Sequence, residues 1–61
     1  MTKALLITQC NDPLRWYADK VGQVVEYCGD EDNEYRSREP EGYTNFVLRS
    51  DAKVVEVSNE V

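Results

Sequence analysis

The sequence predicts a small all-β domain, and three observations support that prediction. Short runs rich in β-branched and aromatic residues recur along the 61 residues, turn-forming residues separate these runs, and no stretch keeps a 3.6-residue apolar period. Five short strands of this kind form either an all-β barrel or a pair of packed sheets. Because no linker, repeat or change of composition interrupts the chain, one domain is expected over residues 1–61, with its ordered core over about 3–57.

The first strand is predicted over residues 3–9, where aliphatic side chains dominate. It ends before Asn11, Asp12 and Pro13, because Asn and Asp favour turns and proline has no amide to donate to a sheet. Residues 14–20 are too few to stand alone as a helix. They are therefore predicted to form a structured loop that contains a 3₁₀ or α turn.

The second and third strands are predicted over residues 21–28 and 34–38, joined by an acidic turn at 29–33. Side chains of a strand alternate between its two faces. This alternation places Val25 and Tyr27 on one face of the second strand. On the third strand it places Tyr35 and Ser37 on one face and the two arginines on the other.

The fourth and fifth strands are predicted over residues 43–49 and 53–57. A turn at residues 40–42 precedes the fourth strand, and a short 3₁₀ turn at residues 50–52 separates the two strands. Residues 58–61 are expected to form a frayed tail.

The buried core is predicted from the inward positions of these strands. The phase of the first, fourth and fifth strands stays open, because apolar runs such as residues 4–7 do not alternate. Such a run is covered on both faces or meets another chain, so a monomer or a weak homodimer is expected. The predicted core comprises Leu5, Ile7, Val21, Val25, Tyr27, Tyr35, Val47 and Val54, with Trp16 as a further candidate.

The charge of the chain disfavours several partners. Twelve acidic residues against seven basic ones give a net charge of −5. Proteins that bind nucleic acid without sequence preference neutralise phosphates with Lys and Arg, so general binding to DNA or RNA is disfavoured. Anionic membrane surfaces are disfavoured for the same reason, and no apolar run approaches the roughly 20 residues of a membrane helix. A basic protein partner is permitted.

Residue types suited to catalysis or metal binding are scarce. The chain has no His and two Cys without a CxxC motif, so acid–base catalysis lacks its usual group and a Zn²⁺ site lacks half of its ligands. No glycine-rich phosphate loop is present. We therefore expect neither an enzyme nor a protein with a cofactor or a bound metal ion.

The order of these segments resembles that of an SH3-like small β-barrel. A first strand is followed by a long irregular loop that holds Trp16 and Tyr17. The strand at residues 21–27 comes next, followed by a variable hairpin tip at 29–33 and a second hairpin turn at 40–42. A single-turn break at residues 50–52 precedes the closing strand. Residues 20–26 are also similar to the glycine-centred strand of KOW-type ribosomal and transcription modules. The resemblance implies a single five-stranded barrel, and short acidic barrels are similar to small bacteriophage proteins. The chain lacks the Ala-Leu-Tyr-Asp-Tyr segment of peptide-binding SH3 domains and the basic charge usual in RNA-binding KOW modules.

The aromatic residues of the long loop make a non-catalytic protein-interaction module the leading hypothesis for function. Trp and Tyr dominate binding hot spots. Neighbours in an extended loop point in opposite directions, so one of Trp16 and Tyr17 is expected to plug the barrel mouth, and Trp16 is the favoured plug. The predicted binding residues are Trp16, Tyr17 and Tyr43, with Asp30, Glu31, Asp32 and Glu34 as an electrostatic guide for a basic partner.

The acidic tip at residues 30–34 has three interpretations: a Ca²⁺ site, a solvated hairpin tip, and a phosphate-like acidic patch presented to a basic protein. Oxygen ligands at alternating positions suit Ca²⁺, but the segment lacks the glycine and the distant bidentate glutamate of an EF-hand loop. A solvated hairpin tip is therefore favoured, in which the carboxylates repel one another without a fixed cation to offset them.

Two alternative functions use the charged residues. In the first, the acidic surface mimics the charge of nucleic acid and inhibits an enzyme by occupying its basic groove. In the second, Arg36, Arg38, Tyr43 and Phe46 form a weak nucleic-acid-binding face. The favoured interpretation of the two arginines is pairing across strands with Glu26, Glu39 or Glu56.

The two cysteines are expected to be free. A disulfide needs Cα atoms within about 7 Å. Cys10 is expected near the start of the second strand and Cys28 at its end, about 20 Å away. Free thiols are typical of a reducing, intracellular setting, so the predicted location is the cytoplasm.

Overall fold

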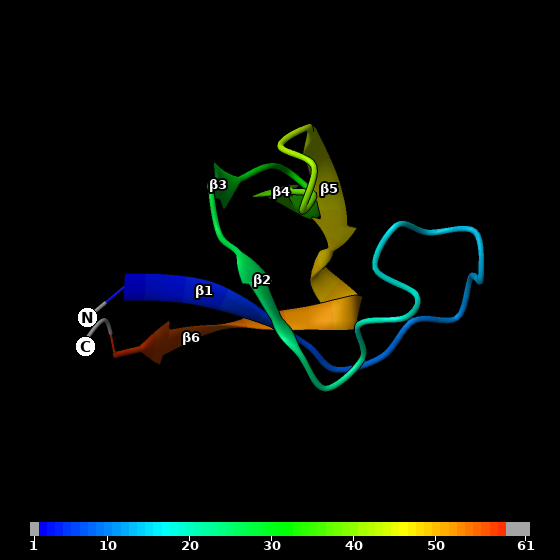
Figure 1. Cartoon of the computed structure of the whole chain (residues 1–61), viewed down its shortest axis with the longest axis horizontal. Helices are drawn as coiled ribbons and strands as arrows, with labels where there is room; N and C mark the ends of the chain where they lie inside the picture. The colour runs from blue at the N-terminus through cyan, green and yellow to red at the C-terminus, as the bar shows by residue number, and fades with distance from the viewer. Residues whose placement is uncertain (1, 59–61) are drawn as a thin grey trace.

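The computed structural model describes residues 2–58 and confirms the all-β class (Figure 1). The strands of the described residues form two antiparallel sheets of three strands each. The first sheet has the order β2–β1–β6, formed by β2 (Val24–Glu26), β1 (Thr2–Ile7) and β6 (Ala52–Val57). The second sheet has the order β3–β4–β5, formed by β3 (Gly29–Asp30), β4 (Glu34–Arg38) and β5 (Thr44–Leu48).

The predicted closed, five-stranded barrel is wrong in two respects. The described chain contains six strands, and these form two separate sheets. The extra strand arises because the strand predicted over residues 21–28 is divided into β2, which pairs with β1, and β3, which pairs with β4. Tyr27 and Cys28 lie at the point where the chain passes from the first sheet to the second.

The other predicted elements are found within two residues of their expected bounds. The 3₁₀ helix η1 (Arg49–Asp51) precedes β6 and confirms the predicted turn. The long loop between β1 and β2 contains consecutive turns rather than a helix, closed by hydrogen bonds such as those from the amide of Ala18 to the carbonyl of Arg15 (3.1 Å) and from the amide of Lys20 to the carbonyl of Tyr17 (2.9 Å). Residues 59–61 of the predicted tail lie outside the described residues.

Gly22 determines where β2 begins. Its φ is +86°, and the turn around it is closed by a 2.8 Å hydrogen bond from the amide of Gln23 to the carbonyl of Lys20. Gly22 donates to the carbonyl of Ile7 (2.8 Å), and the amide of Ile7 donates to the carbonyl of Gln23 (3.0 Å). Two residues therefore oppose Ile7, which is the pattern of a β-bulge with glycine in the left-handed region. Val21 consequently lies in the turn and is 49% exposed, so its predicted place in the core is wrong.

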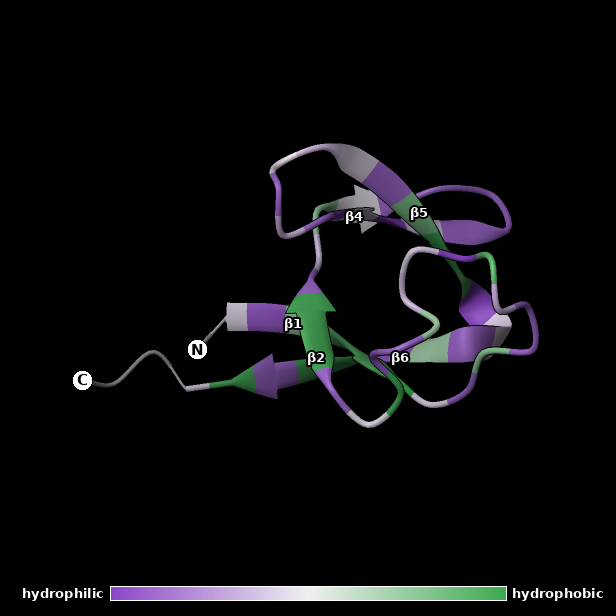
Figure 2. Cartoon of the chain, turned by 45° about the vertical axis from the view of Figure 1, so that its right-hand side comes forward, coloured by the Kyte–Doolittle hydropathy of each residue, from purple (hydrophilic) through white to green (hydrophobic). Residues whose placement is uncertain are grey.

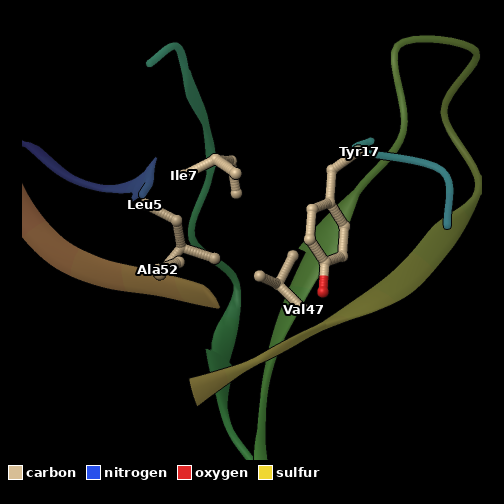
Figure 3. Packing of buried hydrophobic residues seen from close by; sticks show 5 residues of the cluster. All are labelled: Leu5, Ile7, Tyr17, Val47 and Ala52. Carbon is tan, nitrogen blue, oxygen red and sulfur yellow. The ribbon is translucent and has the colours of Figure 1, made fainter. Parts of the chain in front are cut away.

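The core lies between the two sheets and the long loop (Figure 3). Predicted residues Leu5, Ile7 and Val47 are fully buried, which confirms their places in the core and gives the inward phase that the sequence left open for β1 and β5. The other predicted core residues pack against this cluster while keeping some exposed surface: Trp16, Val25, Tyr27, Tyr35 and Val54. The sequence reasoning missed Ala52 and placed Tyr17 among the binding residues, whereas both belong to the buried cluster.

Candidate functional site

Tyr17, rather than Trp16, is the aromatic plug of the long loop. Its side chain has no exposed surface, and its hydroxyl donates a 2.5 Å hydrogen bond to Oδ2 of Asp51, which is 3% exposed. The same hydroxyl accepts a hydrogen bond from the amide of Leu48 (3.4 Å). Burial away from water, followed by the bond to Asp51, raises the pKa of Tyr17 to about 12. A side chain buried in this way has no surface to offer a partner, so the burial of Tyr17 does not support its predicted binding role.

Asp51 joins the start of the long loop to η1. Its Oδ1 accepts a hydrogen bond from Nε2 of Gln9 (3.3 Å), and its carbonyl accepts one from the amide of Thr8 (2.7 Å). Together with the bond from Tyr17, these contacts satisfy a buried carboxylate and hold the loop in one position. The sequence reasoning missed Asp51, because an acidic residue in a break between two strands is also what an ordinary exposed turn contains.

Trp16 attaches the middle of the loop to the second sheet. Its indole Nε1 donates to the carbonyl of Phe46 on β5 (3.0 Å), and its ring packs edge-on to Tyr17 with ring centroids 5.7 Å apart. Trp16 is half-buried, so part of its surface remains available. Trp16 and Tyr17 therefore have different structural roles, as their alternation along the chain predicts. The prediction favoured Trp16 as the buried plug, whereas Tyr17 is the residue that is buried.

An open groove lies beside Trp16, between the long loop and the two sheets. Its volume is about 300 Å³. The floor and walls include hydrophobic residues of β2, which Figure 2 shows as a largely hydrophobic strand, and Val24 is 47% exposed there. The lining residues are Trp16, Lys20, Gln23, Val24, Val25, Glu26, Arg38 and Pro40.

The charged groups of this groove differ from the average charge of the chain. Two cations, Lys20 and Arg38, and one carboxylate, Glu26, line it, although the whole chain carries −5. Nε of Arg38 lies 3.7 Å from Oε2 of Glu26, which confirms one of the expected cross-strand pairs. Nζ of Lys20 lies 3.7 Å from Oδ1 of its exposed neighbour Asp19. Both ion pairs are at long range and partly exposed, so the two cations remain able to bind another anion.

The acidic tip is neutralised in part by two arginines, so the expectation of carboxylates without a fixed cation is wrong. Nη1 of Arg36 pairs with Oε2 of Glu31 (2.5 Å). Nη2 of Arg49 donates to the carbonyl of Glu31 (2.6 Å) and lies 3.9 Å from Oδ1 of Asp30. The hydroxyl of Tyr27 donates to the same Oδ1 (2.7 Å), and this bond raises the pKa of Tyr27.

The predicted binding residues are not brought together. Trp16 lines the groove, whereas Tyr43 is 71% exposed beyond the β4–β5 turn and the acidic residues 30–34 form the β3–β4 hairpin. The proposed nucleic-acid face is assembled in part, because Phe46 lies directly opposite Arg36. Arg36 and Arg38 nevertheless each contact a carboxylate, and this pairing favours neither the nucleic-acid-binding hypothesis nor the charge-mimicking one.

Cysteine and acidic side chains are the potential metal ligands of residues 2–58. No group of three or more Cys, Asp or Glu side chains in this part of the chain is placed to hold a metal ion. Cys10 and Cys28 are free thiols, and each donates a weak hydrogen bond, to the carbonyl of Asp12 (3.2 Å) and to Oε2 of Glu26 (3.4 Å). No helix among the described residues is long and apolar enough to cross a membrane.

Comparisons with known proteins give no family assignment. No protein-family model matches the chain, and no curated protein or solved structure shows significant similarity to it. The groove and the contacts that shape it are therefore the features of the molecule that indicate a function.

Proposed function

We propose that this chain is a non-catalytic protein-interaction module and that the groove beside Trp16 is its binding site. The observation that carries the proposal is an open volume of about 300 Å³ in which exposed Val24 lies with Trp16 and Pro40. Apolar and aromatic surface bordered by a few charged groups is the usual composition of a recognition site.

The contacts of the long loop support a groove that is formed before a partner arrives. The buried bond from Tyr17 to Asp51 and the bond from Trp16 to Phe46 hold the loop at two points. A site that is already ordered loses less conformational entropy on binding, so a small contact area gives a larger net affinity. The charged residues Lys20, Arg38 and Glu26 at the groove then orient the partner.

Relationship to SH3-like proteins is part of this proposal. Its support is the order of elements: a long structured loop follows β1, and the 3₁₀ helix η1 precedes the last strand. The two three-stranded sheets take the place of the closed barrel that the resemblance implies, and the groove lies between them.

Selection of peptides tests the proposed function. A displayed library of random linear peptides of 12 residues is selected on the wild-type chain, and enriched peptides are synthesised and titrated. The variant V24D places a charge in the groove and is expected to weaken peptide binding at least tenfold. V21D is the matched control, because Val21 is equally exposed (49% against 47%) and does not line the groove.

Thermal unfolding of both variants separates binding from folding. Each substitution replaces an exposed side chain, so both variants are expected to unfold within a few degrees of the wild type. The proposal is wrong if no peptide is enriched, or if V24D and V21D bind an enriched peptide equally well.

A further inference from the structure

We propose that the partner enters the groove as an extended strand and forms backbone hydrogen bonds with Val24 of β2 and Arg38 of β4. This inference rests on the proposed function and specifies the form of its ligand. It follows from the direction in which the backbone groups of the two strands point.

Val24 presents its backbone groups to the outer edge of the first sheet. Ile7 exchanges hydrogen bonds with the bulge at residues 22–23, so the amide and carbonyl of Ile7 face β2. Alternate residues of an antiparallel strand face the same neighbour, so Leu5 also faces β2 and bonds its register partner Val25. Val24 and Glu26 must therefore face away from β1. The hydroxyl of Ser37 confirms this direction, since it donates to the carbonyl of Glu26 from the side of β4 (2.5 Å).

Arg38 presents its backbone groups to the facing edge of the second sheet. The amide of Cys28 donates to the carbonyl of Arg36 (2.7 Å), so Arg36 faces β3. The amide of Glu39 donates to the carbonyl of Tyr43 (2.8 Å), so Glu39 faces β5. By alternation Arg38 faces the same side as Arg36, at a position where no residue of β3 is paired with it.

Two unpaired strand edges thus meet at one groove. Among residues 2–58 we find no hydrogen-bond partner for the outward amide and carbonyl of Val24 or of Arg38, and both residues line the groove. Unpaired amides and carbonyls in a row are a template for a further strand. A volume of about 300 Å³ holds about two residues of extended chain, given a strand spacing of about 4.8 Å and a sheet thickness of about 10 Å.

The lining indicates the chemistry of the inserted segment. An apolar side chain of the peptide fits against Val25, Trp16 and Pro40. A carboxylate on a residue one or two positions further along the peptide pairs with Lys20. A segment of another protein is favoured over a second copy of this chain, because two copies that each carry −5 repel one another. The expected ligand is therefore an extended peptide with an apolar residue and an acidic residue.

Amide hydrogen exchange of the ¹⁵N-labelled chain tests this inference. The probe is the tightest-binding peptide from the 12-residue selection, added to saturation. Exchange at the amides of Val24 and Arg38 is expected to slow at least tenfold, whereas the amide of Val25, already bonded to β1, is expected to change less than twofold.

A pair of variants at one position gives a second readout. V24P removes the outward amide, and V24T keeps it with a side chain of similar shape. V24P is expected to bind the peptide about tenfold more weakly than V24T, which corresponds to the loss of one hydrogen bond of about 1.4 kcal/mol. Proline is tolerated on an edge strand when its nitrogen faces away from the sheet, so V24P is expected to fold.

The other outcomes separate failure of this inference from failure of the proposed function. Peptide binding without slower exchange at Val24 and Arg38, or equal binding to V24P and V24T, shows a ligand that is not a strand and leaves the proposed function intact. Slow exchange of Val24 without peptide, together with dimers in sedimentation equilibrium, assigns the edge to a second copy and overturns the inference. Failure to obtain any binding peptide overturns the proposed function and the inference together.

Discussion

The hydroxyl of Tyr17 lies 2.5 Å from the carboxylate of Asp51, and both side chains are buried. The two residues are 34 positions apart in the sequence. Their bond joins the long loop to η1, next to the start of β6. The same loop carries Trp16 and Lys20, so this bond supports one wall of the groove from inside the molecule.

Removal of the Tyr17 hydroxyl is expected to destabilise the fold. Y17F leaves Oδ2 of Asp51 buried without its donor, which costs about 1–3 kcal/mol. Urea unfolding followed by fluorescence measures the change in the free energy of unfolding. Y43F is the matched control, because Tyr43 is 71% exposed, and its stability is expected to stay within about 0.5 kcal/mol of the wild type. Equal stability of Y17F and Y43F would contradict the role of the buried bond.

Stability is expected to fall at high pH. An unfolded tyrosine titrates near pH 10, whereas the pKa of Tyr17 in the fold is about 12. Below about pH 10 the hydroxyl keeps its proton in both states and the full contribution is present; between about pH 10 and 12 the unfolded state releases its proton first, so up to about 2–3 kcal/mol is lost.

Unfolding by urea at pH 8 to 12 measures this dependence. Y17F is expected to lose less stability over the same range, because it lacks the titrating group. Parallel curves for Y17F and the wild type would show that another group, such as Tyr27, controls the loss.

Replacement of Gly22 is expected to destabilise the junction between the loop and β2. A Cβ at this position meets no atom within 4 Å, so the cost of G22A comes from the backbone φ of +86°. The left-handed region costs a non-glycine residue about 1–2 kcal/mol. The control V21A, in the same turn, is expected to change stability by less than about 0.5 kcal/mol. If G22A and V21A have the same midpoint of urea unfolding, the bulge does not depend on glycine.

Two neutralising substitutions in the acidic tip are expected to have different effects on stability. Asp32 has no ion pair or side-chain hydrogen bond among the described residues, so D32N relieves repulsion and stabilises the fold by about a few tenths of a kcal/mol at low salt. D30N weakens the bond from Tyr27 and the contact with Arg49, so it gives no gain or a small loss. Thermal unfolding at low and high salt measures both. A rise in the unfolding temperature on addition of Ca²⁺ that D32N abolishes would instead indicate a metal site.

Both cysteines are expected to react as thiols. Alkylation of the unreduced, denatured chain should add two labels, which mass spectrometry of the intact chain detects. A reductant is expected to leave the unfolding temperature unchanged. An unlabelled chain that is lighter by two hydrogens would show a disulfide and contradict the arrangement of Cys10 and Cys28.

The sequence by itself determined most strands and turns. Pro40 and Gly42 hold the second and fourth positions of a turn closed by the bond from the amide of Gly42 to the carbonyl of Glu39 (2.8 Å), the positions that proline and glycine favour in a type I turn. The two-residue period likewise assigned Val25 and Tyr27 to the core side. These features were predictable because backbone angles and alternation depend on residues adjacent in the chain.

Only the tertiary structure decided which residues the long loop buries and where the groove lies. Tyr17 is buried instead of Trp16 because its hydroxyl reaches a carboxylate 34 residues away, and nothing local to either aromatic residue specifies that partner. The division of one predicted strand into β2 and β3 also depends on distant neighbours, since β1 pairs with the first part and β4 with the second. The unpaired edges of Val24 and Arg38 result from that division. Val24 lies on β2 at the edge of the first sheet, and Arg38 lies on β4 beyond the last residue that pairs with β3.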